Sequence, residues 1–365
     1  MNVGILLILI TTAISTSLLG VFLVLRRMSM MIDAISHTVL LGIVVAFMLV
    51  GDLTSPLLLI GAALMGLLTV FMTEVIIRTK RTSEDSAIGL VFPLLFSIAI
   101  IIISTSFQGV HLDVDAVLLG KIEFAPFDRV YLGGRAIGPR LFYIMLITTL
   151  INLLFVRGFY KELKIVSFDS ALAKTLGFAP ILIHYLLMGL VSLTSVVAFN
   201  AVGSILVVAL MIGPASTAVL MTKNLKWTLL FAVLIGIMNS LIGYVMALII
   251  DVNVSGMIAS MTLLTLLVVL VLEPRRGLLS TIWKRMRLRD RFAYMILLLH
   301  VDNHTDPKEI AYDRIAYELN WTTKKYRKMI KKGLHDHYVH VTDGNVYLTG
   351  TGKRYLDRKV QELAI

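Results

Sequence analysis

The chain has 365 residues, of which 58% are hydrophobic and only 16% are charged. Soluble domains are about 45–50% apolar and about 25% charged, so this composition excludes a soluble fold for most of the chain. The sequence contains no cysteine, which excludes disulfides, thiolate metal sites and cysteine nucleophiles. The net charge of +11 lies mostly at the end: residues 275–365 hold 19 Lys and Arg against 10 Asp and Glu. An apolar body therefore precedes a basic, soluble tail.

The body contains repeated apolar stretches that are long enough to cross a bilayer. The first is not a cleavable signal, because it has no basic start and no small-residue cleavage site before Arg26. Helices satisfy their own backbone hydrogen bonds in lipid, so we expect an all-α polytopic membrane protein. Its nine transmembrane helices are expected at roughly 3–25, 28–50, 55–77, 86–106, 141–157, 179–199, 202–222, 227–250 and 255–272.

Basic residues mark the short loops on one side of this arrangement. They are Arg26, Arg27, Arg78, Lys80, Arg81, Arg157, Lys161, Lys164, Lys174, Lys223, Lys226, Arg275 and Arg276. The positive-inside rule makes this side cytoplasmic, which places the N-terminus outside and the tail inside. The long stretch 107–140 is then external, and we expect a short re-entrant or surface helix at about 114–120.

Two ionisable side chains lie inside the second expected span. Asp33 precedes His37 by four residues, so both lie on one helix face. Ionisable groups in a bilayer are costly and usually face a cavity, and carboxylate with imidazole suits Mn(II), Zn(II) or Fe(II). The alternative is structural: Asp33 reaches the cytoplasmic edge and only hydrogen-bonds His37.

Residues 167–177 form a candidate amphipathic helix in a cytoplasmic loop. Ser167 or Asp169 can cap its start and Gly177 can end it. Such a helix can dock in a groove of a soluble partner, or it can simply rest on lipid.

Residues 202–218 are rich in small side chains, which favours close helix packing. Gly213 and Pro214 can break a span, and broken spans often line translocation paths. An ordinary proline kink inside a bundle is the alternative.

The tail divides into a basic juxtamembrane linker, 275–291, and a small domain, 292–365. The linker is expected to lie against anionic lipid or to be a solvated helix. The domain pattern predicts a winged helix: a helix from Pro307 to Leu319, a turn, a basic helix at 324–334, a hairpin that turns at Asp343 and Gly344, and a last helix capped by Thr349. Residues 350–353 resemble part of a phosphate loop, but Tyr347 replaces the required glycine, so no nucleotide site is predicted.

Three segments together, 33–42, 168–177 and 202–218, resemble the membrane permeases of bacterial manganese/zinc/iron ABC importers. That family shows roughly Gly-Asp-Ala-Ile-Ser-His-Ala-Val-Leu-Pro-Gly. Here Asp33, Ala34, Ile35, Ser36 and His37 match it, with Ile32 in place of the glycine and Leu41 in place of the proline. The resemblance covers residues 1–274, the expected permease domain. The tail resembles the DNA-binding winged helix of metal-dependent repressors.

The resemblance implies a permease that is not itself an enzyme and holds no permanent cofactor. Its implied partners are cytoplasmic ATPase subunits, an external metal-binding lipoprotein and a second permease subunit, in a bacterial cell membrane. Asp33 and His37 are the implied metal site, and Ser36, Gly203, Gly213 and Pro214 are candidates for the path. The implied contacts with the ATPase are Phe168, Asp169, Ala171, Leu172, Ala173, Leu176 and Gly177.

A membrane-tethered transcription regulator is the alternative function. Its recognition helix would carry Lys324, Lys325, Arg327, Lys328, Lys331 and Lys332. A single span would suffice as an anchor, so nine spans disfavour DNA as a partner. A metal carrier driven by an ion gradient is disfavoured because the chain shows no inverted repeat.

Overall fold

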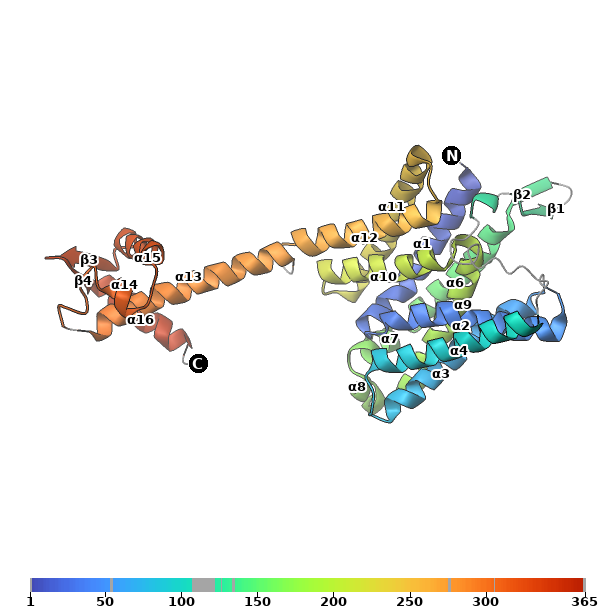
Figure 1. The fold of residues 1–365 in the computed structure, drawn as a ribbon, viewed down its shortest axis with the longest axis horizontal. Helices are drawn as coiled ribbons and strands as arrows, with labels where there is room; N and C mark the ends of the chain where they lie inside the picture. Colours follow the sequence, from blue (N-terminus) through green and yellow to red (C-terminus); the bar gives the residue numbers. More distant parts are fainter. Residues whose placement is uncertain are drawn as a thin grey trace. The chain divides into compact units, whose positions relative to one another are not determined.

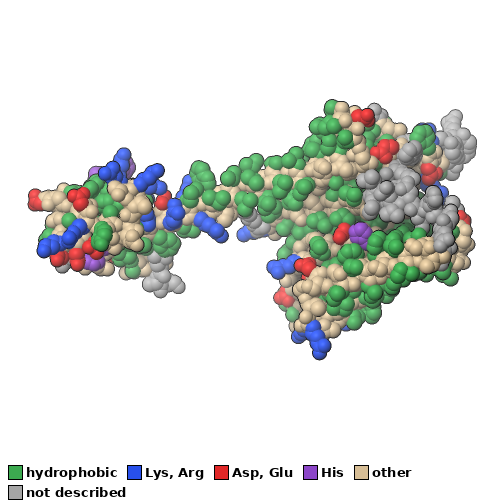
Figure 2. Space-filling view, viewed as in Figure 1, with side chains coloured by type: hydrophobic (Ala, Val, Ile, Leu, Met, Phe, Trp, Pro, Cys, Tyr) green, Lys and Arg blue, Asp and Glu red, His purple; other side chains and the backbone are tan. Residues whose placement is uncertain are grey.

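The structure is a computed structural model that describes residues 2–52, 55–106, 122–125, 127–132, 135–274, 277–304 and 306–363. The chain forms two compact units, Met1–Glu273 and Pro274–Ile365. Figure 2 shows hydrophobic side chains covering much of the visible face of the first unit, whereas Lys and Arg are more frequent on the second.

The first unit is a bundle of long apolar helices (Figure 1). Nine helices among the described residues are long and apolar enough to cross a membrane, which confirms the predicted number. The observed ends differ from the predicted ones by a few residues. The nine are α1 (Val3–Leu25), α2 (Ser29–Val50), α3 (Leu57–Arg78), α4 (Glu84–Ser106), α6 (Arg140–Gly158), α9 (Pro180–Val202), α10 (Ser204–Met221), α11 (Leu225–Ile250) and α12 (Val254–Leu272).

Short elements connect some of these helices. A 3-10 turn, η1 (Ile122–Phe124), and an antiparallel hairpin, β1 (Arg129–Leu132) with β2 (Arg135–Pro139), precede α6. The helix predicted at 114–120 lies outside the described residues. Two short helices, α7 (Tyr160–Phe168) and α8 (Ser170–Thr175), lie between α6 and α9.

Helix α1 forms the centre of the bundle and packs against α6, α9, α10 and α11. It carries a buried run of hydroxyl side chains, and two of the residues in this run are bonded to α6. Thr149 donates to the carbonyl of Thr11 at 3.2 Å, and Asn152 donates to the hydroxyl of Ser15 at 2.8 Å. Hydrogen bonds between helices are one of the forces that hold transmembrane bundles together.

Helix α10 continues through Pro214, so the break predicted at Gly213 and Pro214 is wrong. Proline has no N–H, which leaves the carbonyl of the residue four positions earlier, Leu210, without its helical partner. The hydroxyl of Ser17 on α1 donates to that carbonyl at 3.2 Å. A neighbouring side chain thus satisfies the freed backbone group and keeps the helix intact in an apolar interior.

Replacing Ser17 by alanine is expected to destabilise the bundle by about 0.6–1.7 kcal/mol, the range found for hydrogen bonds between transmembrane helices. The carbonyl of Leu210 then loses its donor. Unfolding of the purified chain in detergent measures the change. Ser260→Ala is the matched control, because the exposed Ser260 hydroxyl bonds only to Gly256 of its own helix. Equal losses in the two variants would contradict the assigned role of Ser17.

The second unit begins with a long helix, α13 (Leu278–Asn303), that runs without a break from the predicted linker into the predicted domain. It is followed by α14 (Ile315–Glu318), α15 (Thr323–His335), the hairpin β3 (Val339–Thr342) and β4 (Asn345–Leu348), and α16 (Gly350–Leu363). Asp343 and Gly344 both have positive φ, as a tight hairpin turn requires, so the predicted hairpin is confirmed. Thr349 accepts from the N–H of Gly352, which confirms the predicted cap.

The helix predicted from Pro307 to Leu319 is wrong over most of its length, because only Ile315–Glu318 is α-helical. The backbone before α14 pairs with the hairpin instead. Val346 donates to the carbonyl of Ile310, and Tyr312 donates to the carbonyl of Gly344, each at 2.9 Å. These bonds hold residues 310–312 extended beside the strands.

Candidate functional site

Asp33 and His37 lie on one face of α2, as their spacing predicted. Asp33 Oδ1 and His37 Nε2 are 3.7 Å apart. His37 is the ninth residue of α2, about 12 Å along the axis from its start. Leu41 stands where the related motif has proline, and α2 runs through it without a break. The two side chains therefore project from a single continuous helix.

The pair is open on one side. His37 packs between Phe92 and Phe96 of α4, with ring centroids 5.6 Å from each. Its side chain is nevertheless 33% exposed and that of Asp33 is 47% exposed. Among the described residues, no group of three or more His, Cys, Asp or Glu side chains is placed to hold a metal ion. Any further carboxylate or imidazole ligand for a metal bound by Asp33 and His37 would therefore come from outside the described part of the chain.

The other path candidates lie at different places. The Ser36 hydroxyl donates to the backbone carbonyl of Asp33 at 2.6 Å, which is a hydrogen bond within α2. Gly203 has φ of +82° at the junction of α9 and α10, a conformation that favours glycine. Gly213 is buried, and a Cβ there would lie 2.2 Å from Thr262 of α12. The geometry of Gly213 and Pro214 is that of close helix packing, and their place on a path stays a prediction.

The expected loop helix is present as α8. Asp169 caps it by accepting from the N–H of Leu172 at 2.9 Å, and Gly177 has φ of +82° just beyond its end. Of the predicted contact residues, Ala173 is fully buried and is therefore not available to a partner. The others are exposed, namely Phe168, Asp169, Ala171, Leu172, Leu176 and Gly177. Three large apolar side chains, Phe168, Leu172 and Leu176, thus face outward on a short ordered element.

A polar cluster that the sequence analysis missed lies next to α8. Glu74 of α3 has one carboxylate oxygen 2.7 Å from His184 Nε2 and the other 2.6 Å from the hydroxyl of Tyr185, both on α9. Arg26, at the end of α1, donates to the hydroxyl of Ser167 on α7 at 3.1 Å. Burial lowers the pKa of Arg26 to about 10, which still leaves it charged at neutral pH. Glu74 and His184 lie inside apolar spans, and ionisable residues in such spans could have indicated this cluster from the sequence.

A cavity of about 640 Å³ opens between these groups and α8. Arg26, Arg78 and Lys174, which come from three predicted basic loops, all line it. These three loops therefore lie at one end of the bundle, as the charge pattern requires. The Arg26–Ser167 bond joins α7 to the end of α1, and the cavity is lined by residues of α8 and of the ends of α3 and α9.

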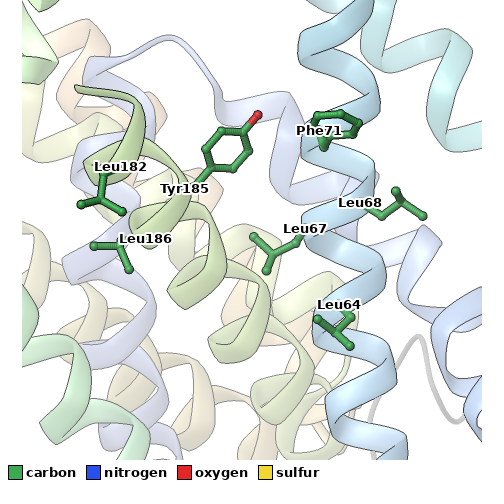
Figure 3. Close-up of a pocket in the computed structure, with 7 residues that line it drawn as sticks. All are labelled: Leu64, Leu67, Leu68, Phe71, Leu182, Tyr185 and Leu186. Carbon is green, nitrogen blue, oxygen red and sulfur yellow. The ribbon is translucent and has the colours of Figure 1, made fainter. Parts of the chain in front are cut away.

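A second hollow, of about 440 Å³, lies between α3 and α9 (Figure 3). Its lining is apolar apart from one phenol: Leu64, Leu67, Leu68 and Phe71 on α3, and Leu182, Tyr185 and Leu186 on α9. The Tyr185 hydroxyl is engaged by Glu74. This hollow offers no carboxylate or imidazole to a metal ion, and the Asp33–His37 pair stays the predicted metal site.

Comparison with known proteins gives consistent matches. The sequence profile of the ABC 3 transport family matches residues 2–273. The chain is 41% identical to the manganese transport system membrane protein MntD of Bacillus subtilis (strain 168) over 271 residues, which are 74% of this chain and 92% of the relative. It is 36% identical to the zinc transport system membrane protein TroD of Treponema pallidum (strain Nichols) over 356 residues, 96% of this chain and 97% of the relative. The second match extends through the second unit.

A solved structure is similar as well. PsaBC from Streptococcus pneumoniae in complex with Fab matches with a TM-score of 0.62 and 31% sequence identity, over 75% of this chain and 92% of that chain. The profile match to the whole transmembrane unit, with relatives above 30% identity along nearly their full length, shows that this chain belongs to the ABC 3 transport family.

Proposed function

We propose that this chain is the membrane-spanning subunit of an ABC importer that brings a divalent transition metal, manganese in the first place, into a bacterial cytoplasm. Family membership and the manganese and zinc systems among its relatives support this assignment. The N-terminus is outside and the second unit is cytoplasmic. Hydrolysis of ATP belongs to a separate partner subunit, and this chain performs no chemistry.

The Asp33–His37 pair is the observation that carries the proposal. An oxygen and a nitrogen ligand from one helix turn suit manganese, zinc or iron, and the absence of cysteine favours manganese. The pair is partly exposed and needs further ligands, which a second permease subunit would supply across an interface. A few weak ligands per subunit suit a transient stop, because an ion bound too tightly would not leave.

In the proposed transport cycle, the two ends of the transmembrane unit bind different partners. An external metal-binding lipoprotein delivers the ion to the permease pair. On the cytoplasmic side α8 docks on the ATPase subunits, and their closure on ATP moves it. The Arg26–Ser167 bond between α1 and α7 and the Glu74–Tyr185 bond between α3 and α9 transmit that motion to the bundle. The ATP-bound partners thus shift the population between outward-open and inward-open states.

Transport by the whole complex tests the proposal. The chain, its ATPase and its second permease are reconstituted in liposomes with the lipoprotein outside, and uptake of radioactive manganese is measured with and without ATP. We expect ATP-dependent uptake that unlabelled manganese competes away more effectively than zinc or iron. Absence of ATP-dependent uptake of all three metals by an assembled complex would contradict the function, and preference for zinc would contradict only the choice of metal.

Leu172→Asp is expected to separate the permease from its ATPase while the permease still folds. Leu172 is exposed on α8, and its side chain takes no part in the Asp169 cap, which uses only the backbone N–H of this residue. A charge at a buried interface anchor costs about 2 kcal/mol or more, which is about 30-fold in affinity. Copurification of the ATPase and metal-stimulated hydrolysis measure the effect. Ser83→Asp, which adds the same charge at an exposed position before α4, is the control. Normal copurification by Leu172→Asp would remove α8 as the docking helix.

We propose in addition that the second unit is a winged-helix module, similar to that of metal-dependent repressors, that regulates transport from the cytoplasm. Its order of helix, basic helix, hairpin and helix supports this, as does the full-length similarity to the Treponema relative. Deleting residues 292–365 removes its core, because α13 joins that core from Ala293 onward. The shortened permease is expected to insert and transport, with an altered response to cytoplasmic metal. An inserted, assembled but inactive permease would instead make this unit part of the transport machinery.

A further inference from the structure

The first half of α13 presents an apolar face that the rest of the second unit, as far as the structure describes it, does not cover. Leu278, Ile282 and Met286 follow one another at four-residue spacing, and Leu279 and Trp283 lie beside them on the same side of the helix. All five side chains are exposed, and Trp283 is 61% exposed. An exposed tryptophan in a cluster of large aliphatic side chains marks an interaction surface.

The surface is separate from the core of the second unit. That core takes Ala293, Tyr294, Leu297, Leu298 and Val301 from the second half of the same helix. The helix therefore has two functions along its length. Residues after 292 hold the second unit together, whereas the apolar side chains between residues 278 and 286 are not covered by it.

Charge decides between the two occupants that could cover this face, a second copy of the helix or a lipid surface. Residues 284–291 contain Lys284, Arg285, Arg287, Arg289 and Arg291 against a single acid, Asp290. That acid pairs with Lys328 within its own unit. Two copies of so basic a helix would repel each other, because like charges near an interface are unfavourable. An anionic bilayer surface attracts each basic residue instead.

The chain path also favours lipid. Helix α12 is one of the nine spanning candidates among the described residues and ends at Leu272, and five residues separate it from Leu278, where α13 begins. A headgroup layer is about 5–7 Å thick on each side of the hydrocarbon core. From residue 278 to residue 286 a helix rises about 12 Å. A helix that leaves the bilayer at a slant thus keeps its first turns in that layer, where tryptophan is enriched.

We propose that residues 278–291 form an interfacial helix that inserts its apolar face among the headgroups of the inner leaflet and binds anionic phospholipid through its basic flanks. The choice of leaflet rests on the proposed orientation, but the contact itself does not depend on metal transport. The helix anchors the start of the second unit to the membrane surface.

Tryptophan fluorescence of the full chain in nanodiscs tests the proposal. Trp227→Phe and Trp321→Phe together leave Trp283 as the only indole. In bilayers that contain phosphatidylglycerol we expect blue-shifted emission that brominated lipids quench. Quenching is expected to be weaker in pure phosphatidylcholine and at high salt. The double variant Arg287→Gln with Arg289→Gln should lower the affinity of the helix for the anionic bilayer by about fivefold for each charge removed. The matched chain that keeps only Trp321, an indole of the second unit stacked by Lys325, should stay unquenched.

Cross-linking tests whether a second copy of the helix, rather than lipid, covers this face. Because the chain has no cysteine, Ile282→Cys introduces a unique thiol. We expect no efficient disulfide between copies in anionic nanodiscs that hold two permeases. Three results would overturn the proposal. The first is Trp283 emission at the wavelength of an indole in water, without quenching. The second is quenching that does not depend on lipid charge or salt, and the third is efficient cross-linking through residue 282. Each is read without any transport assay, so failure here is distinct from failure of the proposed function.

Discussion

Replacing Asp33 by asparagine is expected to abolish metal uptake while the chain still inserts and assembles with its partners. The amide keeps the size of the carboxylate and one acceptor oxygen but removes the charge that favours a divalent ion. Changes in groups that only orient a metal ligand already cost about 10–100-fold. Loss of a direct ligand should therefore reduce uptake by at least about 100-fold. His37→Ala should have the same effect, because it removes the other ligand from that helix turn.

The measurement is metal uptake by reconstituted complexes, with ATPase copurification as the assembly check. Asp85→Asn is the matched control, since it makes the same chemical change at an exposed carboxylate in the first turn of α4. Uptake near the normal rate is expected from the control. If Asp33→Asn and His37→Ala both transport at the normal rate, the pair is structural, an aspartate at the membrane edge bonded to a histidine.

Gly20→Ala is expected to prevent the bundle from packing. A Cβ at Gly20 would lie 1.8 Å from the carbonyl oxygen of Met211, a backbone atom of α10. A side chain could rotate away from the added methyl, but a helix backbone cannot. Moving α10 away would also strain the bond between Ser17 and Leu210. Overpacking usually costs about 1–3 kcal/mol, and a clash with backbone should exceed about 3 kcal/mol.

The yield of monodisperse protein in detergent and its unfolding temperature measure this effect. Gly89→Ala is the control, because it also lies within an apolar span but a Cβ there meets no atom within 4 Å. The control should equal the parent or slightly exceed it, since alanine favours helix more than glycine does. A Gly20→Ala chain as stable as the control would mean that α1 and α10 are not in close contact.

Much of the fold was predictable because local chemistry decides it. The lengths of the apolar stretches determine the nine spanning helices, and the cap at Asp169 and the glycine at 177 determine where the short helix α8 begins and ends. Asp343 and Gly344 set the hairpin turn in the second unit. In each case the determining residues lie within the element or next to it, so the sequence carries the whole signal.

The errors have tertiary causes. The segment after Pro307 has a plausible helical pattern, but Ile310 and Tyr312 pair with a hairpin more than 30 residues later. Pro214 suggests a helix break, but the carbonyl of Leu210 that it leaves without a donor is bonded by a hydroxyl 193 residues earlier, on α1. The Glu74–His184 contact joins segments 110 residues apart. The position of Asp33 and His37 on one face of α2 was predictable from their spacing, while the partial exposure of both side chains was visible only in the structure.

The central position of α1 has a consequence for synthesis in the cell. The partners of Thr11, Ser15 and Ser17 lie 138, 137 and 193 residues later in the chain. A ribosome adds about 5–20 residues per second, so the first helix waits about 10–40 s for its last partner. During that interval the carbonyl of Thr11 and the hydroxyls of Ser15 and Ser17 lack the partners that they have in the finished bundle. The helix that holds the finished bundle together is thus the one that depends longest on the surroundings of the nascent chain.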